Sequence, residues 1–139
     1  MIRILCNSNP KKKQMLTCQA LRKFSMDRPP EIMLGRAPEV QTAYDSFSKQ
    51  KKNRGSFVST MEKKLDGKKY YFVKNDFPYH TVDGIEHWVC WYKDDEENKA
   101  KKIISELKSK YNIITCWKNL PHNCSIQEIC HIHVFLETN

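Results

Sequence analysis

The sequence is poor in glycine and contains none of the glycine-rich phosphate-binding loops. Only four glycines occur among 139 residues, and neither G-x-x-x-x-G-K nor G-x-G-x-x-G is present. Those loops need glycine because their backbone must approach the phosphates closely. A P-loop ATPase and a Rossmann dehydrogenase are therefore excluded. A serine-hydrolase elbow is absent too.

Long apolar runs and paired cysteines are also missing. No stretch approaches the roughly 20 apolar residues that span a bilayer, and residues 1–6 are too short for the apolar region of a signal peptide. The six cysteines show no C-x-x-C spacing, which favours packed free thiols over a disulfide framework. We therefore expect a cytoplasmic protein that does not enter the membrane.

The net charge of +8 comes mostly from lysine. Specific nucleic-acid readers favour arginine, whose fork matches phosphates and base edges. Arginine occurs only at Arg3, Arg22, Arg28, Arg36 and Arg54. Nucleic acid is therefore a weaker candidate partner than a small molecule.

The pattern of apolar residues predicts one domain of the α+β class. Residues 1–33 are a poorly determined basic lead-in, and residues 34–139 form the domain. A helix begins at Pro38 and ends at residues 53–55, and Ser56 starts a second short helix. A β-β-α-β-β order follows. Its strands are expected at residues 69–73, 85–92, 113–117 and 132–136. This order predicts N-terminal helices followed by a mostly antiparallel four-stranded sheet, with helices packed on one face.

Three histidines are the candidate catalytic residues. Side chains alternate along a strand, so His131 and His133 share one face, opposite the apolar Ile132. His87 joins them if the two histidine-bearing strands are neighbours. Histidine titrates near neutrality and suits proton transfer or phosphate binding. The alternative is structural, since a strand histidine often only donates to a backbone carbonyl.

Loop residues next to these strands are the candidate ligand-binding residues. They are Asn75, Asp76, Tyr79 and Asn119. Together with the histidines, their amide, carboxylate and phenol groups could hold a phosphate or a sugar ring.

A metal site would use the three histidines, with Asp76 as a further ligand. The sequence lacks the second fixed ligand pair of zinc motifs, so no metal ligand is predicted and no cofactor is assigned. The paired H-x-[ST] motifs of two-histidine phosphoesterases are also incomplete, because His131 is followed by Ile132 and His133.

Several segments resemble the N-acetylglucosamine-induced proteins, a fungal-type family with a domain of unknown function. The resemblance covers roughly residues 34–137. Its segments are residues 34–39 (LGRAPE), 75–79 (NDFPY), 84–91 (GIEHWVCW), 125–126 (SI) and 131–134 (HIHV). The sequence departs from the family at residues 119–121 and 124–127. The resemblance implies no established catalytic residues and favours amino-sugar or sugar-nucleotide metabolism.

Two hypotheses of different classes follow. In the first, the protein binds or processes a phosphorylated or nucleotide-linked small molecule at the histidine, asparagine, aspartate and tyrosine site. In the second, it is a non-catalytic module that binds a protein or nucleic acid, with Trp88, Trp91 and Trp117 as core or partner anchors. The sequence does not decide between enzyme and binding module.

Overall fold

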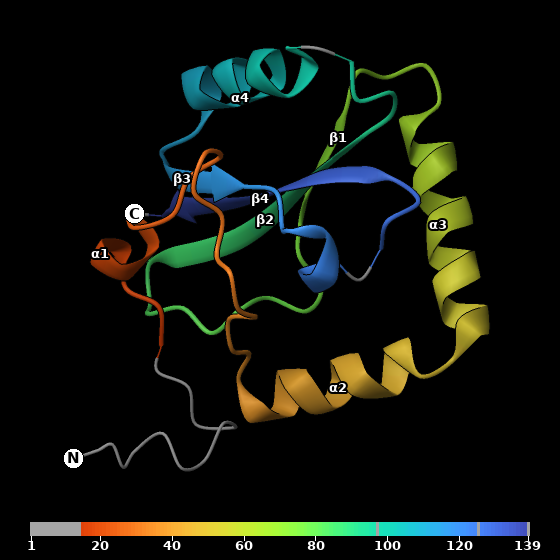
Figure 1. Ribbon diagram of the computed structural model, residues 1–139, viewed down its shortest axis with the longest axis horizontal. Coiled ribbons are helices and arrows are strands. Elements are labelled where there is room, and N and C mark those ends of the chain that lie inside the picture. Colours follow the sequence, from red (N-terminus) through yellow and green to blue (C-terminus); the bar gives the residue numbers. More distant parts are fainter. Residues whose placement is uncertain (1–14, 97, 125, 139) are drawn as a thin grey trace.

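The computed structural model describes residues 15–96, 98–124 and 126–138. Four strands form one antiparallel sheet in the order β1-β2-β4-β3. Its strands are β1 (Tyr71–Lys74), β2 (Ile85–Tyr92), β3 (Ile113–Trp117) and β4 (Cys130–Glu137). The predicted α+β class and four-stranded antiparallel sheet are confirmed (Figure 1).

The helices cover the sheet from both sides, so the expectation that they pack on one face is wrong, because both faces of the central strands carry buried apolar side chains. The helix α4 (Lys99–Lys110) packs Ile103, Ile104 and Leu107 on the face that carries Ile132, as the alternation in the last strand predicts. The helix α3 (Lys51–Leu65) lies on the opposite face, where Met61 joins the core. Figure 1 shows α4 on one side of the sheet and α2 (Pro38–Ser48) with α3 on the other.

The break between α2 and α3 lies earlier than predicted. The chain leaves helical geometry at Gln50, and α3 begins at Lys51, so Gly55 lies inside α3 instead of ending a helix. A glycine in a helix costs about 1 kcal/mol, which the packing of Phe57 and Met61 against the sheet offsets. The side chain of Asn53 donates to the carbonyl of Phe47 at the end of α2 (3.2 Å).

The segment 15–33 is part of the packed domain, so the predicted boundary after residue 33 does not mark its edge. The short helix α1 (Cys18–Leu21) buries Leu21 completely, against a cluster that includes Trp117 and Phe135. Leu16 also exchanges backbone hydrogen bonds with the loop at residues 80–82. Residues 1–14 of the predicted lead-in lie outside the described part of the chain.

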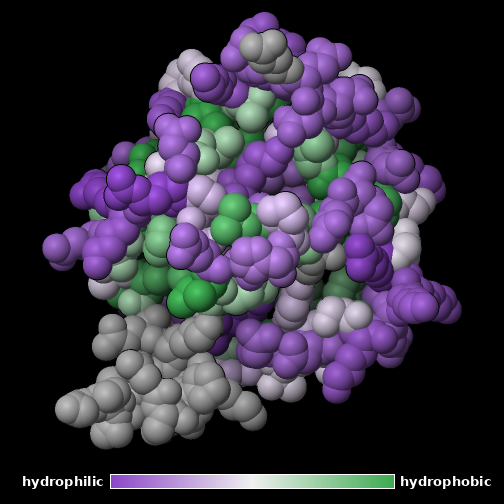
Figure 2. All heavy atoms as spheres, viewed as in Figure 1, coloured by the Kyte–Doolittle hydropathy of each residue, from purple (hydrophilic) through white to green (hydrophobic). Residues whose placement is uncertain are grey.

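The surface in the view of Figure 2 is mostly hydrophilic, with hydrophobic residues showing between the polar ones. The five cysteines in the described ranges are free thiols. Within those ranges, no helix is both long and apolar enough to cross a bilayer.

Candidate functional site

The antiparallel pairing of β2 with β4 brings the histidines together. His133 lies opposite Val89 in the register, His131 opposite Trp91, and Phe135 opposite His87. All of these side chains point to the face of the sheet that α3 covers, as strand alternation requires. The predicted meeting of the three histidines is therefore observed.

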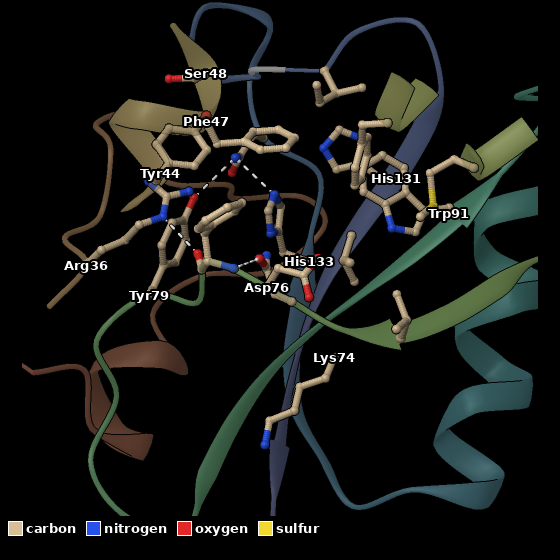
Figure 3. A pocket seen from close by; sticks show the side chains of 18 of the residues that line it. Arg36, Tyr44, Phe47, Ser48, Lys74, Asp76, Tyr79, Trp91, His131 and His133 are labelled. Carbon is tan, nitrogen blue, oxygen red and sulfur yellow. Dashed lines mark hydrogen bonds between the residues drawn. The ribbon is translucent and has the colours of Figure 1, made fainter. Parts of the chain in front are cut away.

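A cavity of about 330 Å³ lies between this face, α2, α3 and the loop after β1. His131 and His133 line it, and so do the predicted ligand residues Asn75, Asp76, Tyr79 and Asn119. Figure 3 shows Phe47, Tyr79 and His133 turned toward this space from α2, from the loop after β1 and from β4, whereas the Lys74 side chain points away from it.

His87 takes a different place from the other two histidines. Its ring is 1% exposed and does not line the cavity, but lies behind His133, with 2.8 Å between His87 Nε2 and His133 Nδ1. The backbone N–H of Tyr79 donates to His87 Nδ1 (3.0 Å). Among the three candidate catalytic histidines, His87 is therefore the one that does not line the cavity itself.

His133 also touches Asn119, whose amide is held in a fixed orientation. Asn119 Nδ2 lies 3.1 Å from His133 Nε2 and donates to the Tyr79 hydroxyl (3.3 Å). The indole N–H of Trp117 donates to Asn119 Oδ1 (3.0 Å). Because an indole N–H can only donate, it identifies that atom as the amide oxygen.

The ring of His131 is oriented by a hydrogen bond to the backbone. Its Nδ1 lies 3.1 Å from the carbonyl oxygen of Ile129, which can only accept, so Nδ1 carries the proton. The neutral ring therefore has its lone pair on Nε2, which is 4.0 Å from Cys124 Sγ. His131 Nδ1 thus donates to a backbone carbonyl, which is the structural alternative that we expected for a strand histidine. The ring of His131 nevertheless lines the cavity as well.

Burial favours the uncharged form of all three rings. Burial lowers the pKa of His87 to about 3, and the nearby positive charge of Arg36 lowers it further. Burial also lowers the pKa of His131 and, far more, that of His133. Neutral imidazoles can present an N–H to a ligand without the cost of a buried charge.

Arg36 is a site residue that the sequence interpretation did not include. Its Nε donates to the carbonyl of Phe77 (2.8 Å), and its guanidinium lies over the ring of Tyr44, 4.0 Å from the ring centre, and 5.2 Å from that of Tyr79. The arginine stands two residues before Pro38, the first residue of α2. No local pattern in the sequence marks it, because the carbonyl that orients its guanidinium belongs to Phe77 in the loop after β1.

The remaining walls are mostly aromatic or apolar. They include Phe47, Phe57, Met61, Tyr71, Val73, Trp91 and Ile126. The sequence marked Trp91 as an anchor, and its ring, 5% exposed, packs 4.5 Å from that of His131.

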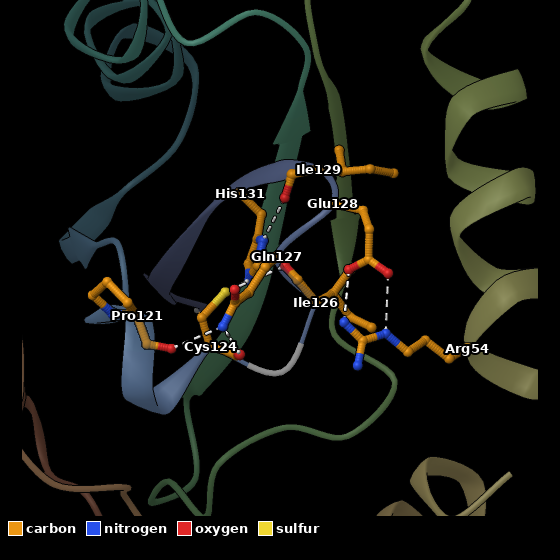
Figure 4. Close-up of polar contacts among 8 residues, drawn as sticks. All are labelled: Arg54, Pro121, Cys124, Ile126, Gln127, Glu128, Ile129 and His131. Atoms are coloured by element: carbon orange, nitrogen blue, oxygen red, sulfur yellow. Dashed lines mark hydrogen bonds and ion pairs between the residues drawn. The ribbon is translucent and has the colours of Figure 1, made fainter. Parts of the chain in front are cut away.

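The segment before β4 closes one side of the cavity. Arg54 of α3 pairs with Glu128 through two contacts of 2.7 and 3.1 Å. Gln127 donates to the carbonyls of Pro121 and Cys124, at 3.1 and 3.4 Å (Figure 4). These contacts tie the segment to α3 and to the turn at residues 121–123.

The described residues contain no cluster of three or more histidine, cysteine or acidic side chains placed to hold a metal ion. The residues that line the cavity instead offer N–H donors, the guanidinium groups of Arg36 and Arg54, one ammonium, one carboxylate and aromatic faces. This combination is suited to an anionic organic molecule.

Comparisons with known proteins give a fold and no function. No protein-family model matches the sequence, and no curated protein matches it. A solved structure described as the crystal structure of HTC1 is similar in fold, with a TM-score of 0.55 and 17% sequence identity over 76% of this chain and 77% of that one. The chain therefore shares an α+β fold with that protein.

Proposed function

We propose that this protein binds a small phosphorylated or nucleotide-linked molecule in the cavity between the sheet, α2 and α3. The observation that carries the proposal is the guanidinium of Arg36 at the cavity wall. Among the described residues Arg36 has no carboxylate partner, and only its Nε is used, by the carbonyl of Phe77. Its terminal N–H groups remain for a ligand, and their fork geometry fits a phosphate.

The size and walls of the cavity support the same ligand class. A volume of about 330 Å³ is at the lower end of the range for small-molecule sites. The rings of Tyr44, Phe47 and Trp91 supply flat apolar surface for a sugar or a base. The resemblance to the N-acetylglucosamine-induced family favours an amino-sugar derivative within this class. His131 and His133 are the candidates for any acid–base chemistry on the bound molecule.

A thermal-shift screen tests the proposal. The probes are inorganic phosphate, glucose 6-phosphate, N-acetylglucosamine 6-phosphate, nucleotides and nucleotide sugars. A ligand that binds only the folded state raises the melting temperature by mass action. We expect an organic phosphate to do so with the wild type and with His80→Ala, but not with His133→Ala. His80 is the matched control because it does not line this cavity.

A second function is favoured by the opposite face of the sheet. The partly buried rings of Phe72 and Trp88 stack 4.9 Å apart, and Tyr111, 41% exposed, lies 5.0 Å from Phe72. Such a cluster could anchor a protein or nucleic-acid partner beside the lysine-rich surface. This interaction module would be supported over the first proposal by two results together. No small molecule would raise the melting temperature, and binding to a protein or nucleic acid would survive His131→Ala.

We propose a cytoplasmic location for either function. The free thiols of the described cysteines fit a reducing compartment.

A further inference from the structure

The hydrogen-bond chain behind the cavity runs from Tyr79 through His87 and His133 to Asn119. Its consecutive separations are 3.0 Å to His87 Nδ1, 2.8 Å between the two rings and 3.1 Å to Asn119 Nδ2. The first group is a backbone N–H and the last is an amide NH₂, so both ends of the chain are donors.

This arrangement determines where the ring protons lie. His87 Nδ1 accepts from Tyr79, so neutral His87 carries its proton on Nε2 and donates it to His133 Nδ1. Neutral His133 must then carry its own proton on Nε2. The opposite direction would require His87 to lose both ring protons, which does not occur near neutral pH.

The last contact of the chain consequently pairs two donors. Asn119 Nδ2 has two hydrogens, and the Tyr79 hydroxyl and the carbonyl of Asn123 are placed to accept them, at 3.3 and 3.4 Å. The amide oxygen is taken by Trp117. The His133 Nε2–H therefore has no acceptor among the described residues, although its ring is 6% exposed. A buried donor without an acceptor is costly, and an oxygen of a ligand in the cavity could accept from it.

We infer that His87 is a positioning residue, which fixes His133 in the tautomer that offers an N–H to an acceptor oxygen of the ligand. His131 is fixed in the other tautomer by Ile129, and the two rings are 5.4 Å apart between centres. Neighbouring imidazoles thus provide one donor and one lone pair. The matching ligand carries an anionic oxygen and a separate hydroxyl or amide N–H elsewhere in the molecule, as a sugar phosphate does.

The inferred ligand class rests on the proposed function, whereas the tautomers can be measured without a ligand. Long-range ¹H–¹⁵N correlation spectra of the ¹⁵N-labelled protein distinguish protonated from unprotonated ring nitrogens. We expect Nε2–H for His87 and His133 and Nδ1–H for His131. An Nδ1–H tautomer at His133 in the wild type would overturn the positioning role. In a folded His87→Phe variant, an Nδ1–H population should appear at His133, while His80→Phe should leave it unchanged.

Titration calorimetry with glucose 6-phosphate and with inorganic phosphate tests the ligand class. We expect glucose 6-phosphate to bind at least tenfold more tightly than inorganic phosphate, and at least tenfold more weakly to His87→Phe than to the wild type. Equal affinity for both probes would overturn the ligand class. If the ring protons lie where we expect but no organic phosphate binds, the result counts against the proposed function alone. If His133 carries its proton on Nδ1 and glucose 6-phosphate still binds strongly, the result counts against the positioning role of His87 alone.

Discussion

His87 and His133 contact each other through ring nitrogens 2.8 Å apart, while both rings are almost completely buried. A proton on either ring would place a charge in this interior, close to Arg36. Burial accordingly lowers the pKa of His87 to about 3. This pair makes the fold sensitive to acid.

We predict that the free energy of unfolding decreases as the pH falls below about 6.5. Unfolded histidine takes up a proton near that value, whereas folded His87 does so only near pH 3. In between, the unfolded state binds more protons, so stability is lost with falling pH, at about 1.4 kcal/mol per pH unit for each such histidine.

Urea unfolding at pH values from 7.5 to 5 measures this slope. His87→Gln should reduce it, and His80→Gln should not, because His80 is outside the buried pair. A stability that is constant over this range would contradict the buried neutral pair.

The helix α1 offers a test of the domain boundary. Leu21 is completely buried against Trp117 and Phe135. We expect Leu21→Ala to lower the free energy of unfolding by about 2–5 kcal/mol, as for other large-to-small core changes. Arg22→Ala, at the exposed end of the same helix, should change it by about 0.5 kcal/mol or less. Equal small effects in urea unfolding would mean that residues 15–33 do not contribute to the core.

The Arg54–Glu128 pair ties α3 to the segment before β4, but both side chains are about half exposed. Exposed ion pairs contribute about 0–1 kcal/mol. A double-mutant cycle with Arg54→Ala and Glu128→Ala should therefore give a coupling free energy below about 1 kcal/mol, which salt reduces. A coupling of several kcal/mol would show that this contact determines the position of the segment.

Local patterns predicted the sheet well. The bounds of β2 and β3 agree with the expected residues 85–92 and 113–117, because apolar and β-branched runs between turn residues are local signals. The turn before β2 contains Gly84, whose positive φ of 89° suits a glycine. The helix end predicted at residues 53–55 was wrong, because Gly55 lies inside α3. The tertiary packing of α3 overrides the weak local preference of a glycine against helix.

The site could be predicted only in part. Strand alternation placed His131 and His133 on one face, and both line the cavity. The depth of His87 and the role of Arg36 depend on segments far apart in the sequence, such as the carbonyl of Phe77 that orients Arg36. Such contacts have no local sequence signal.

The guanidinium of Arg36, which has no carboxylate partner among the described residues, is the feature on which the proposed function depends most. Titration calorimetry with N-acetylglucosamine 6-phosphate, on the wild type and on Arg36→Gln, tests it most directly, with Arg22→Gln as the matched loss of one exposed positive charge. We predict that the wild type and Arg22→Gln bind alike and that Arg36→Gln binds at least tenfold more weakly, about 1.4 kcal/mol or more. Equal binding by all three proteins, or no binding to the wild type by this or any other organic phosphate, would contradict a phosphate site at Arg36.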